Sequence, residues 1–176
     1  PGAFDNQALR PYNAGPDALL VNFKSVRLLL QPDPARNAVR VIAEPPSDGL
    51  RIDNQLSLGR DACGDWREQI RPAVNALVIE LSGSFPAACG ERALSLAPWT
   101  ADVQTEGLFR ALWRELGGKF SGRVRTGQVP ATARTLAVQE SPTLGEIVRD
   151  INKYSNNVMA RQLFLSLDNE RPATTD

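Results

Sequence analysis

Short segments of alternating apolar and polar residues constrain the fold of this chain more than any other feature. Successive side chains of a strand point to opposite faces, so this alternation is typical of a half-buried β-strand. Turn sequences such as Gln31-Pro-Asp-Pro and Glu44-Pro-Pro-Ser-Asp-Gly separate the segments at intervals of roughly ten residues. The alternating segments are residues 18–31, 38–43, 50–58, 77–83 and 92–97. Together they predict a small antiparallel β-sandwich.

The chain on either side of these segments is less regular. Residues 1–16 are rich in Pro, Gly and Asn and predict an extended or turn-like stretch. In the first strand segment the alternation slips at Lys24 and Ser25, which predicts a bulge or bend. After the strands, apolar residues between Asp102 and Leu116 recur with helical spacing, and Gly117-Gly118 ends the pattern. Residues 119–130 predict a strand or hairpin, and residues 135–141 predict another short strand.

A second helical pattern, from Leu144 to Leu165, is interrupted by the poor helix formers of Lys153-Tyr-Ser-Asn-Asn. Ser155 falls on the apolar stripe between Ile151 and Val158, where an apolar residue would continue the pattern. On one continuous helix Ser155 and Asn157 would point to different faces. The sequence therefore predicts two helices joined by a polar turn, with Ser155 or Asn156 capping the second helix. The first helix is predicted to begin at Ser141-Pro142, with Ser141 as N-cap, and the polar residues 168–176 are predicted to be frayed.

Composition excludes several classes of function. The 176 residues carry 20 basic and 20 acidic side chains, so no nucleic-acid surface is indicated. Histidine is absent, which excludes Ser-His-Asp and Cys-His catalysis and imidazole metal ligands within this chain. Its two cysteines alone cannot form a four-thiolate zinc site. No apolar run approaches the roughly 20 residues that cross a bilayer, and the sequence shows no signal peptide. No cofactor or metal is expected.

The polar turn carries a family resemblance. Tyr154-Ser-Asn-Asn resembles the S-x-N motif, the second of three motifs in serine penicillin-binding proteins and β-lactamases. The longer run Asp150-Ile-Asn-Lys-Tyr-Ser-Asn-Asn-Val-Met-Ala-Arg-Gln-Leu resembles the penicillin-binding protein 4 group of D-alanyl-D-alanine carboxypeptidases. Asp17-Ala-Leu-Leu-Val-Asn-Phe, Trp113-Arg-Glu-Leu-Gly-Gly and Gly122-Arg-Val-Arg resemble segments of the same group in the same order.

The other two motifs of that family are missing. The chain has three lysines, and Val21, Leu116 and Asp150 stand three residues before them, so no S-x-x-K exists. Arg125-Thr-Gly imitates the third motif, K-T-G, but precedes S-x-N, so it is interpreted as a turn between strands. The chain is therefore interpreted as an internal fragment of such an enzyme, and the fragment alone is expected to be inactive.

The resemblance implies a fold and a division of the chain. It implies an α+β, mainly β chain: a β-sandwich insert, part of an α+β insert, and two helices of a transpeptidase-like domain. Residues 1–10 would end the outer insert, and residues 11–106 would form the inner sandwich. Residues 107–130 would complete the outer insert, and residues 131–176 would begin the returning catalytic domain.

The resemblance also implies a chemistry. The full-length protein would be a periplasmic, serine-type D-Ala-D-Ala carboxypeptidase or endopeptidase that binds β-lactams and acts on peptidoglycan stem peptides through an acyl-enzyme. Ser155 would help to move a proton to the leaving amine, and Asn157 would bind the substrate's amide. An exported setting favours a Cys63–Cys89 disulfide, whereas in a reducing compartment the two would be free thiols. The alternative function is a noncatalytic β-sandwich module that binds wall polymer or a partner. The oligomeric state is open.

Other side chains give weaker signals. Acidic residues near Trp66 and a group of arginines are each more typical of a solvated surface than of a binding site. The tryptophans are predicted to lie in the core. These residues are Asp61, Asp65 and Glu68; Arg123, Arg125 and Arg134; and Trp66, Trp99 and Trp113.

Overall fold

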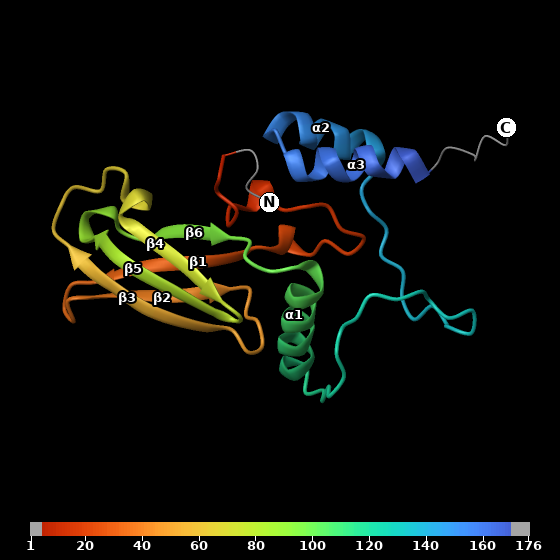
Figure 1. The fold of residues 1–176 in the computed structure, drawn as a ribbon, viewed down its shortest axis with the longest axis horizontal. Coiled ribbons are helices and arrows are strands. Elements are labelled where there is room, and N and C mark those ends of the chain that lie inside the picture. Colours follow the sequence, from red (N-terminus) through yellow and green to blue (C-terminus); the bar gives the residue numbers. More distant parts are fainter. Residues whose placement is uncertain (1–4, 170–176) are drawn as a thin grey trace.

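The computed structural model describes residues 5–169 and shows a mixed α+β chain. Within residues 5–169, six strands, three α-helices and four short 3-10 helices follow one another along the sequence (Figure 1). The strands are β1 (Val26–Asp33), β2 (Ala38–Glu44), β3 (Arg51–Gly59), β4 (Ile70–Asn75), β5 (Val78–Pro86) and β6 (Arg92–Leu96). The helices are α1 (Ala101–Glu115), α2 (Leu144–Tyr154) and α3 (Asn157–Asn169), with 3-10 helices η1 (Pro11–Asn13), η2 (Asn22–Lys24), η3 (Trp66–Gln69) and η4 (Ala87–Cys89). This agrees with the predicted α+β class.

The strands form two three-stranded sheets, in the orders β2-β1-β6 and β3-β5-β4. The first sheet is antiparallel throughout, as predicted. In the second sheet β5 pairs antiparallel with β4 but parallel with β3. The prediction of a wholly antiparallel sandwich is therefore wrong for the β3–β5 pair. The ten residues between β3 and β4 allow the chain to cross the sheet, which leaves room for β5 between them.

The two sheets enclose the core of the sandwich. Leu28 and Leu30 of β1 face Ile79 and Leu81 of β5, and all four are completely buried. Alternate residues of these strands point inward, as the sequence pattern predicts. Phe85 meets Trp66 edge to face, with ring centroids 5.6 Å apart. These core side chains come from both sheets, so the sandwich buries one continuous apolar layer.

Two differences from the predicted strands have local causes. Residues 18–25 do not form a strand, because Asn22, Phe23 and Lys24 all have positive φ and turn the chain in η2. The predicted bend is thus correct, and β1 begins only after it. The structure also contains β4, which the sequence did not predict. Pro72 interrupts its pattern, but β4 is the edge strand of its sheet, where the missing N–H of proline is tolerated.

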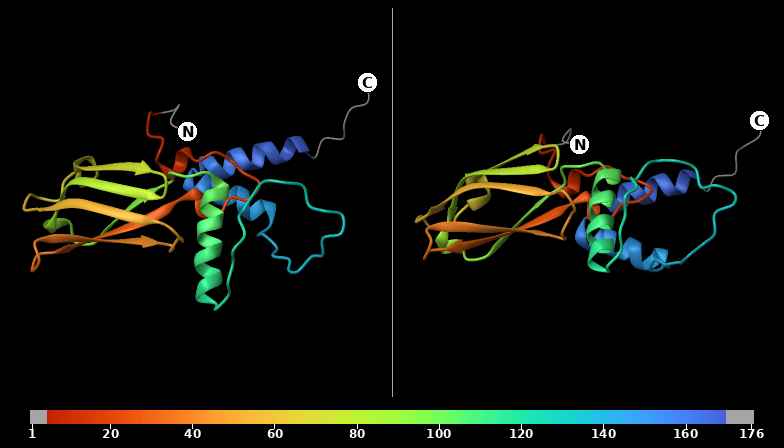
Figure 2. Two further views of the ribbon diagram at one scale, coloured as in Figure 1. Left: turned by 60° about the horizontal axis from the view of Figure 1, so that its bottom comes forward. Right: turned by 90° about the horizontal axis from the view of Figure 1, so that it is seen from below.

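Helix α1 stands at one end of the sandwich, steeply inclined to the strands (Figures 1 and 2). It ends at Glu115, just before Gly117, which has positive φ and stops the helix as the sequence predicted. The carbonyl of Gly107 accepts a hydrogen bond of 2.9 Å from the N–H of Asp48, in the connection between β2 and β3. The predicted boundary between the inner sandwich and the outer insert, between residues 106 and 107, falls inside this helix. The division into domains remains a prediction.

The apolar stripe of α1 only partly faces the sandwich. Leu108 is buried, but Phe109 and Trp113 stack on each other with centroids 5.5 Å apart and remain 39% and 43% exposed. The prediction that all tryptophans lie in the core is therefore wrong for Trp113. It is correct for Trp66. The indole N–H of half-buried Trp99 donates to the carbonyl of Ala76 at 2.7 Å.

Residues 118–143 form a long irregular connection that leads away from the sandwich (Figure 2). The strands predicted at residues 119–130 and 135–141 are therefore absent from the described chain. Leu136 and Val138 are 91% and 77% exposed, so the alternation is present but has no apolar layer to cover. A strand needs a neighbouring strand to bond its backbone, and no described strand lies beside this segment.

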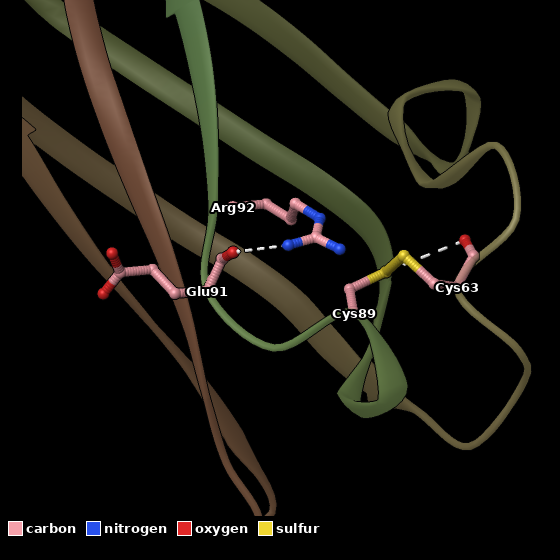
Figure 3. Close-up of a disulfide and its surroundings, with 4 residues drawn as sticks. All are labelled: Cys63, Cys89, Glu91 and Arg92. Atoms are coloured by element: carbon pink, nitrogen blue, oxygen red, sulfur yellow. Dashed lines mark hydrogen bonds between the residues drawn. A yellow bond between two sulfur atoms is a disulfide. The ribbon is translucent and has the colours of Figure 1, made fainter.

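A disulfide joins the loop after β3 to the connection between β5 and β6 (Figure 3). Cys63 contributes from the loop and Cys89 from η4, and their Cα atoms are 4.6 Å apart. Cys89 is almost completely buried against the core. The bond ties the segment that contains η3 to the sandwich.

Candidate functional site at the break between α2 and α3

The candidate site depends on how α2 begins. Thr143 is the N-cap: its hydroxyl accepts from the N–H of Glu146, whose carboxylate accepts from the N–H and hydroxyl of Thr143. This capping box satisfies two backbone donors that helix geometry leaves free. The hydroxyl and N–H of Thr143 also hold the pKa of Glu146 below its usual value. The predicted N-cap, Ser141, is therefore wrong, because a reciprocal pair was available two residues later.

Helix α2 ends at Ser155, which adopts the left-handed conformation with φ 49° and ψ 45°. The next residue, Asn156, is the cap of α3, and its side-chain oxygen accepts from the N–H of Met159 at 3.0 Å. The N–H of Asn156 closes the turn by donating to the carbonyl of Ile151 at 3.1 Å. The predicted break is thus confirmed, with Asn156 as the cap. A left-handed conformation costs a non-glycine residue about 1–2 kcal/mol, so the surrounding contacts hold Ser155 in it.

Two apolar residues anchor the turn from either side. Ile151 of α2 and Val158 of α3 are 9% and 2% exposed, respectively. Helix α3 also contacts the N-terminal segment, where the N–H of Asp17 donates to the side-chain oxygen of Gln162 at 3.1 Å. The turn is therefore held by packing on both flanking helices and by a segment distant in sequence.

The polar side chains of the turn face away from these buried anchors and are exposed. Ser155 and Asn157 are both exposed, and within residues 5–169 neither the hydroxyl nor the side-chain amide makes a hydrogen bond. Lys153 and Tyr154 lie beside them, with the ammonium 5.2 Å from the ring centroid. The turn thus presents a hydroxyl that can accept or donate a proton and an amide that can donate to a carbonyl and accept from an N–H.

The weaker candidates gain little from the structure. Asp61, Asp65 and Glu68 are exposed, and no group of residues able to hold a metal ion occurs in the described chain. The three arginines noted in the sequence lie exposed in the irregular connection, and Arg125-Thr-Gly does not join two strands.

Two further arginines were missed by the sequence analysis. Arg10 and Arg67 are far apart in the sequence but line one groove at the side of the sandwich. No local pattern could have found them, because only the fold brings them together.

Comparison with known proteins identifies the family. The model of the D-Ala-D-Ala carboxypeptidase 3 (S13) family matches residues 1–176. The chain belongs to this family. Two solved structures of penicillin-binding protein 4 from Haemophilus influenzae share its fold, with TM-scores of 0.67 and 0.63. Each is 20% identical, and the second was solved with a bound β-lactam.

The matches also define how much of an S13 protein is present. The chain is covered to 91% and 87% in the two comparisons, but it spans only 35% of each of those chains. A comparison with curated protein sequences finds no match. None of the helices in the described residues combines the length and apolar character needed to cross a membrane.

Proposed function

We propose that this chain supplies the sandwich insert and the S-x-N segment of an exported serine D-Ala-D-Ala carboxypeptidase or endopeptidase. The full-length protein would act on peptidoglycan stem peptides in the periplasm and would be acylated by β-lactams. The observation that carries the proposal is the exposed Ser155-Asn156-Asn157 turn, fixed between two helices, in a chain that the S13 family model matches from end to end. The disulfide supports an oxidising location.

The proposed reaction has two steps. A serine of an S-x-x-K motif elsewhere in the full-length protein attacks the carbonyl carbon between the two D-alanines, and its proton passes to a basic group. The C–N bond then breaks, the leaving amine takes up a proton, and an ester remains on the enzyme. Water hydrolyses this ester in the second step. Ser155 and Asn157 of this chain contribute to the first step.

Ser155 and Asn157 take different roles in that step. The hydroxyl of Ser155 donates a proton towards the departing amine and is resupplied from its neighbours. The side-chain amide of Asn157 holds the substrate's acylamide group, donating to the carbonyl and accepting from the N–H. Both roles need side chains that make no hydrogen bond within the protein, and within residues 5–169 neither side chain makes one. The fixed turn keeps both groups in position before the substrate arrives.

Fluorescent-penicillin labelling of the full-length protein tests the proposal. Ser155→Ala and Asn157→Ala should each slow acylation by about 100-fold, the lower range for a lost proton-transfer group or oriented donor. Ser166→Ala is the matched control, since Ser166 lies exposed on α3 well beyond the turn. Full labelling rates in the Ser155 and Asn157 variants would refute the assigned roles. A full-length protein that is not labelled at all would refute the proposed function.

A further inference from the structure

The sandwich has an open side where the edge strands of its two sheets meet. Strand β6 ends one sheet and β4 ends the other, so each has one edge without a strand partner in the described chain. Residues 6–10 run across this side, and the N–H of Ala97 donates to the carbonyl of Leu9 at 2.7 Å. Beneath them lies a groove of about 330 Å3, here called the seam groove. This volume is at the lower end of the range for small-ligand sites.

The floor of the seam groove is apolar and narrow. Ile70 of β4 and Leu94 and Leu96 of β6 form it, beside Pro72. These three branched side chains expose only 5%, 5% and 2% of their surfaces. Because so little of each is accessible, the floor can contact a methyl group but cannot enclose a long apolar side chain.

The walls of the seam groove are cationic. Arg10 and Arg67 line it, and none of its described lining residues is acidic. Neither arginine forms an ion pair within the described chain. The guanidinium of Arg67 lies 4.5 Å from the ring centroid of Trp66, which orients it while its N–H groups stay available. The Nε–H of Arg10 donates to the side-chain oxygen of Gln7 at 2.7 Å, and its terminal N–H groups have no hydrogen-bond partner in the described chain. Two guanidinium groups without an ion-pair partner, over an apolar floor, favour a ligand with carboxylates spaced along a chain of small apolar groups.

We infer that the seam groove binds a carboxylate-rich, alanine-containing stem peptide of peptidoglycan, at a site separate from the catalytic turn. The methyl group of alanine fits the narrow floor, and two peptide carboxylates pair with Arg10 and Arg67. The free edge of β4 offers backbone groups to an extended peptide, whereas residues 6–10 already lie beside the end of β6, where the N–H of Ala97 bonds Leu9. This inference rests on the proposed function for the identity of the ligand. A groove of this kind would hold the enzyme on the wall polymer while the catalytic domain cuts a neighbouring stem.

Calorimetric titration of the full-length protein tests the inference. The protein is first acylated with penicillin, so that the catalytic cleft is closed to ligand. It is then titrated with a soluble stem tetrapeptide that ends in a single D-alanine and so lacks the D-Ala-D-Ala bond. Arg10→Gln and Arg67→Gln should each weaken binding by about tenfold or more, as expected when a charge-assisted hydrogen bond is lost. Arg71→Gln is the matched control, because Arg71 lies on β4 between two groove residues but does not line the groove.

The outcomes separate the inference from the proposed function. Absent binding, or equal binding by the wild-type protein and both arginine variants, would overturn the inference. Equal affinity for a linear L-peptide of alanine and glutamate would overturn the assignment to a stem peptide and indicate an acidic protein segment instead. Arg67→Lys, which keeps the charge, should retain more affinity than Arg67→Gln and excludes a simple packing defect. Failure of penicillin to acylate the protein refutes the proposed function alone, since titration of the unacylated protein still tests the groove.

Discussion

Gly83 in the central strand of the second sheet should tolerate no side chain. It lies in β5, opposite Leu56 of β3 and Ile70 of β4, and its φ is +105°. A Cβ placed on Gly83 would lie 2.0 Å from the carbonyl oxygen of Gln69 and 3.2 Å from its carbonyl carbon. The obstructing atoms belong to the backbone, so no rotamer change can relieve the contact. Gly83→Ala must move a strand or the end of η3.

Two costs add in this variant. The positive φ costs a residue with a Cβ about 1–3 kcal/mol. Moving a closely packed strand away from the new methyl group costs about another 1–3 kcal/mol, as for other overpacked sites. We therefore expect Gly83→Ala to lower the free energy of unfolding by about 2–6 kcal/mol, a large part of the stability of a typical domain. Gly117→Ala is the matched control: its φ is +82° and nothing lies within 4 Å of its Cβ position, so it bears only the first cost.

Urea unfolding measures the difference. Tryptophan emission, to which Trp66 contributes from its packing against Phe85, reports the surroundings of the three indoles, and far-ultraviolet circular dichroism reports the whole chain. With an unchanged m-value, the shift in midpoint gives the change in stability. A loss for Gly83→Ala no larger than that for Gly117→Ala would refute the claim that the Gln69 carbonyl excludes a side chain.

Four further predictions follow from other parts of the chain. Gly107→Ala would place a Cβ 2.1 Å from the hydroxyl oxygen of Ser47, so it should cost about 1–3 kcal/mol in urea unfolding, and adding Ser47→Ala should restore most of the loss. Alkylation of the denatured, unreduced protein should find no free thiol at Cys63 or Cys89, and replacing both by serine should cost about 3 kcal/mol. The N–H of Val124 and the guanidinium of Arg110 lower the pKa of Glu106. The ionised carboxylate therefore stabilises the fold above the unfolded pKa near 4.5, and this stabilisation is lost as the pH falls through the lower folded pKa. The Glu106→Gln variant should lose less stability on acidification than the wild-type chain. The 176-residue chain alone should not be labelled by fluorescent penicillin, because it has no S-x-x-K motif; stoichiometric labelling would contradict the assigned roles.

The break between α2 and α3 could be predicted from sequence because the bonds that form it join residues close along the chain. The cap of α3 joins Asn156 to Met159, and the turn joins Asn156 to Ile151. Such bonds depend on residue types within one helical turn, which the sequence displays directly. The predicted first cap, Ser141, was wrong for a related reason. Serine and threonine are both good caps, and the reciprocal bond with Glu146 places the cap at Thr143.

The groove and the pairing of the second sheet depend on residues far apart in sequence. The parallel pairing of β3 with β5 depends on where the chain crosses after β3, and no residue type marks that crossing. Arg10 and Arg67 line the same groove only because residues 6–10 run across the open side of the sandwich. Pattern analysis detects which residues face the core, but it does not detect which strands become neighbours.

The irregular connection, residues 118–143, shows the converse limit of pattern analysis: a strand pattern is present in it, but no strand forms. Residues 135–141 alternate as well as several true strands do, yet they form no strand and remain exposed. A segment with alternating residues can cover an apolar layer as a strand, but it forms a strand only where the edge of a sheet lies close enough to bond with it. Strands β1 and β5 find such partners because short turns deliver β2 and β4 beside them. The connection from α1 to α2 receives no such partner from the described chain, so Leu136 and Val138 stay exposed despite a sequence that favours a strand.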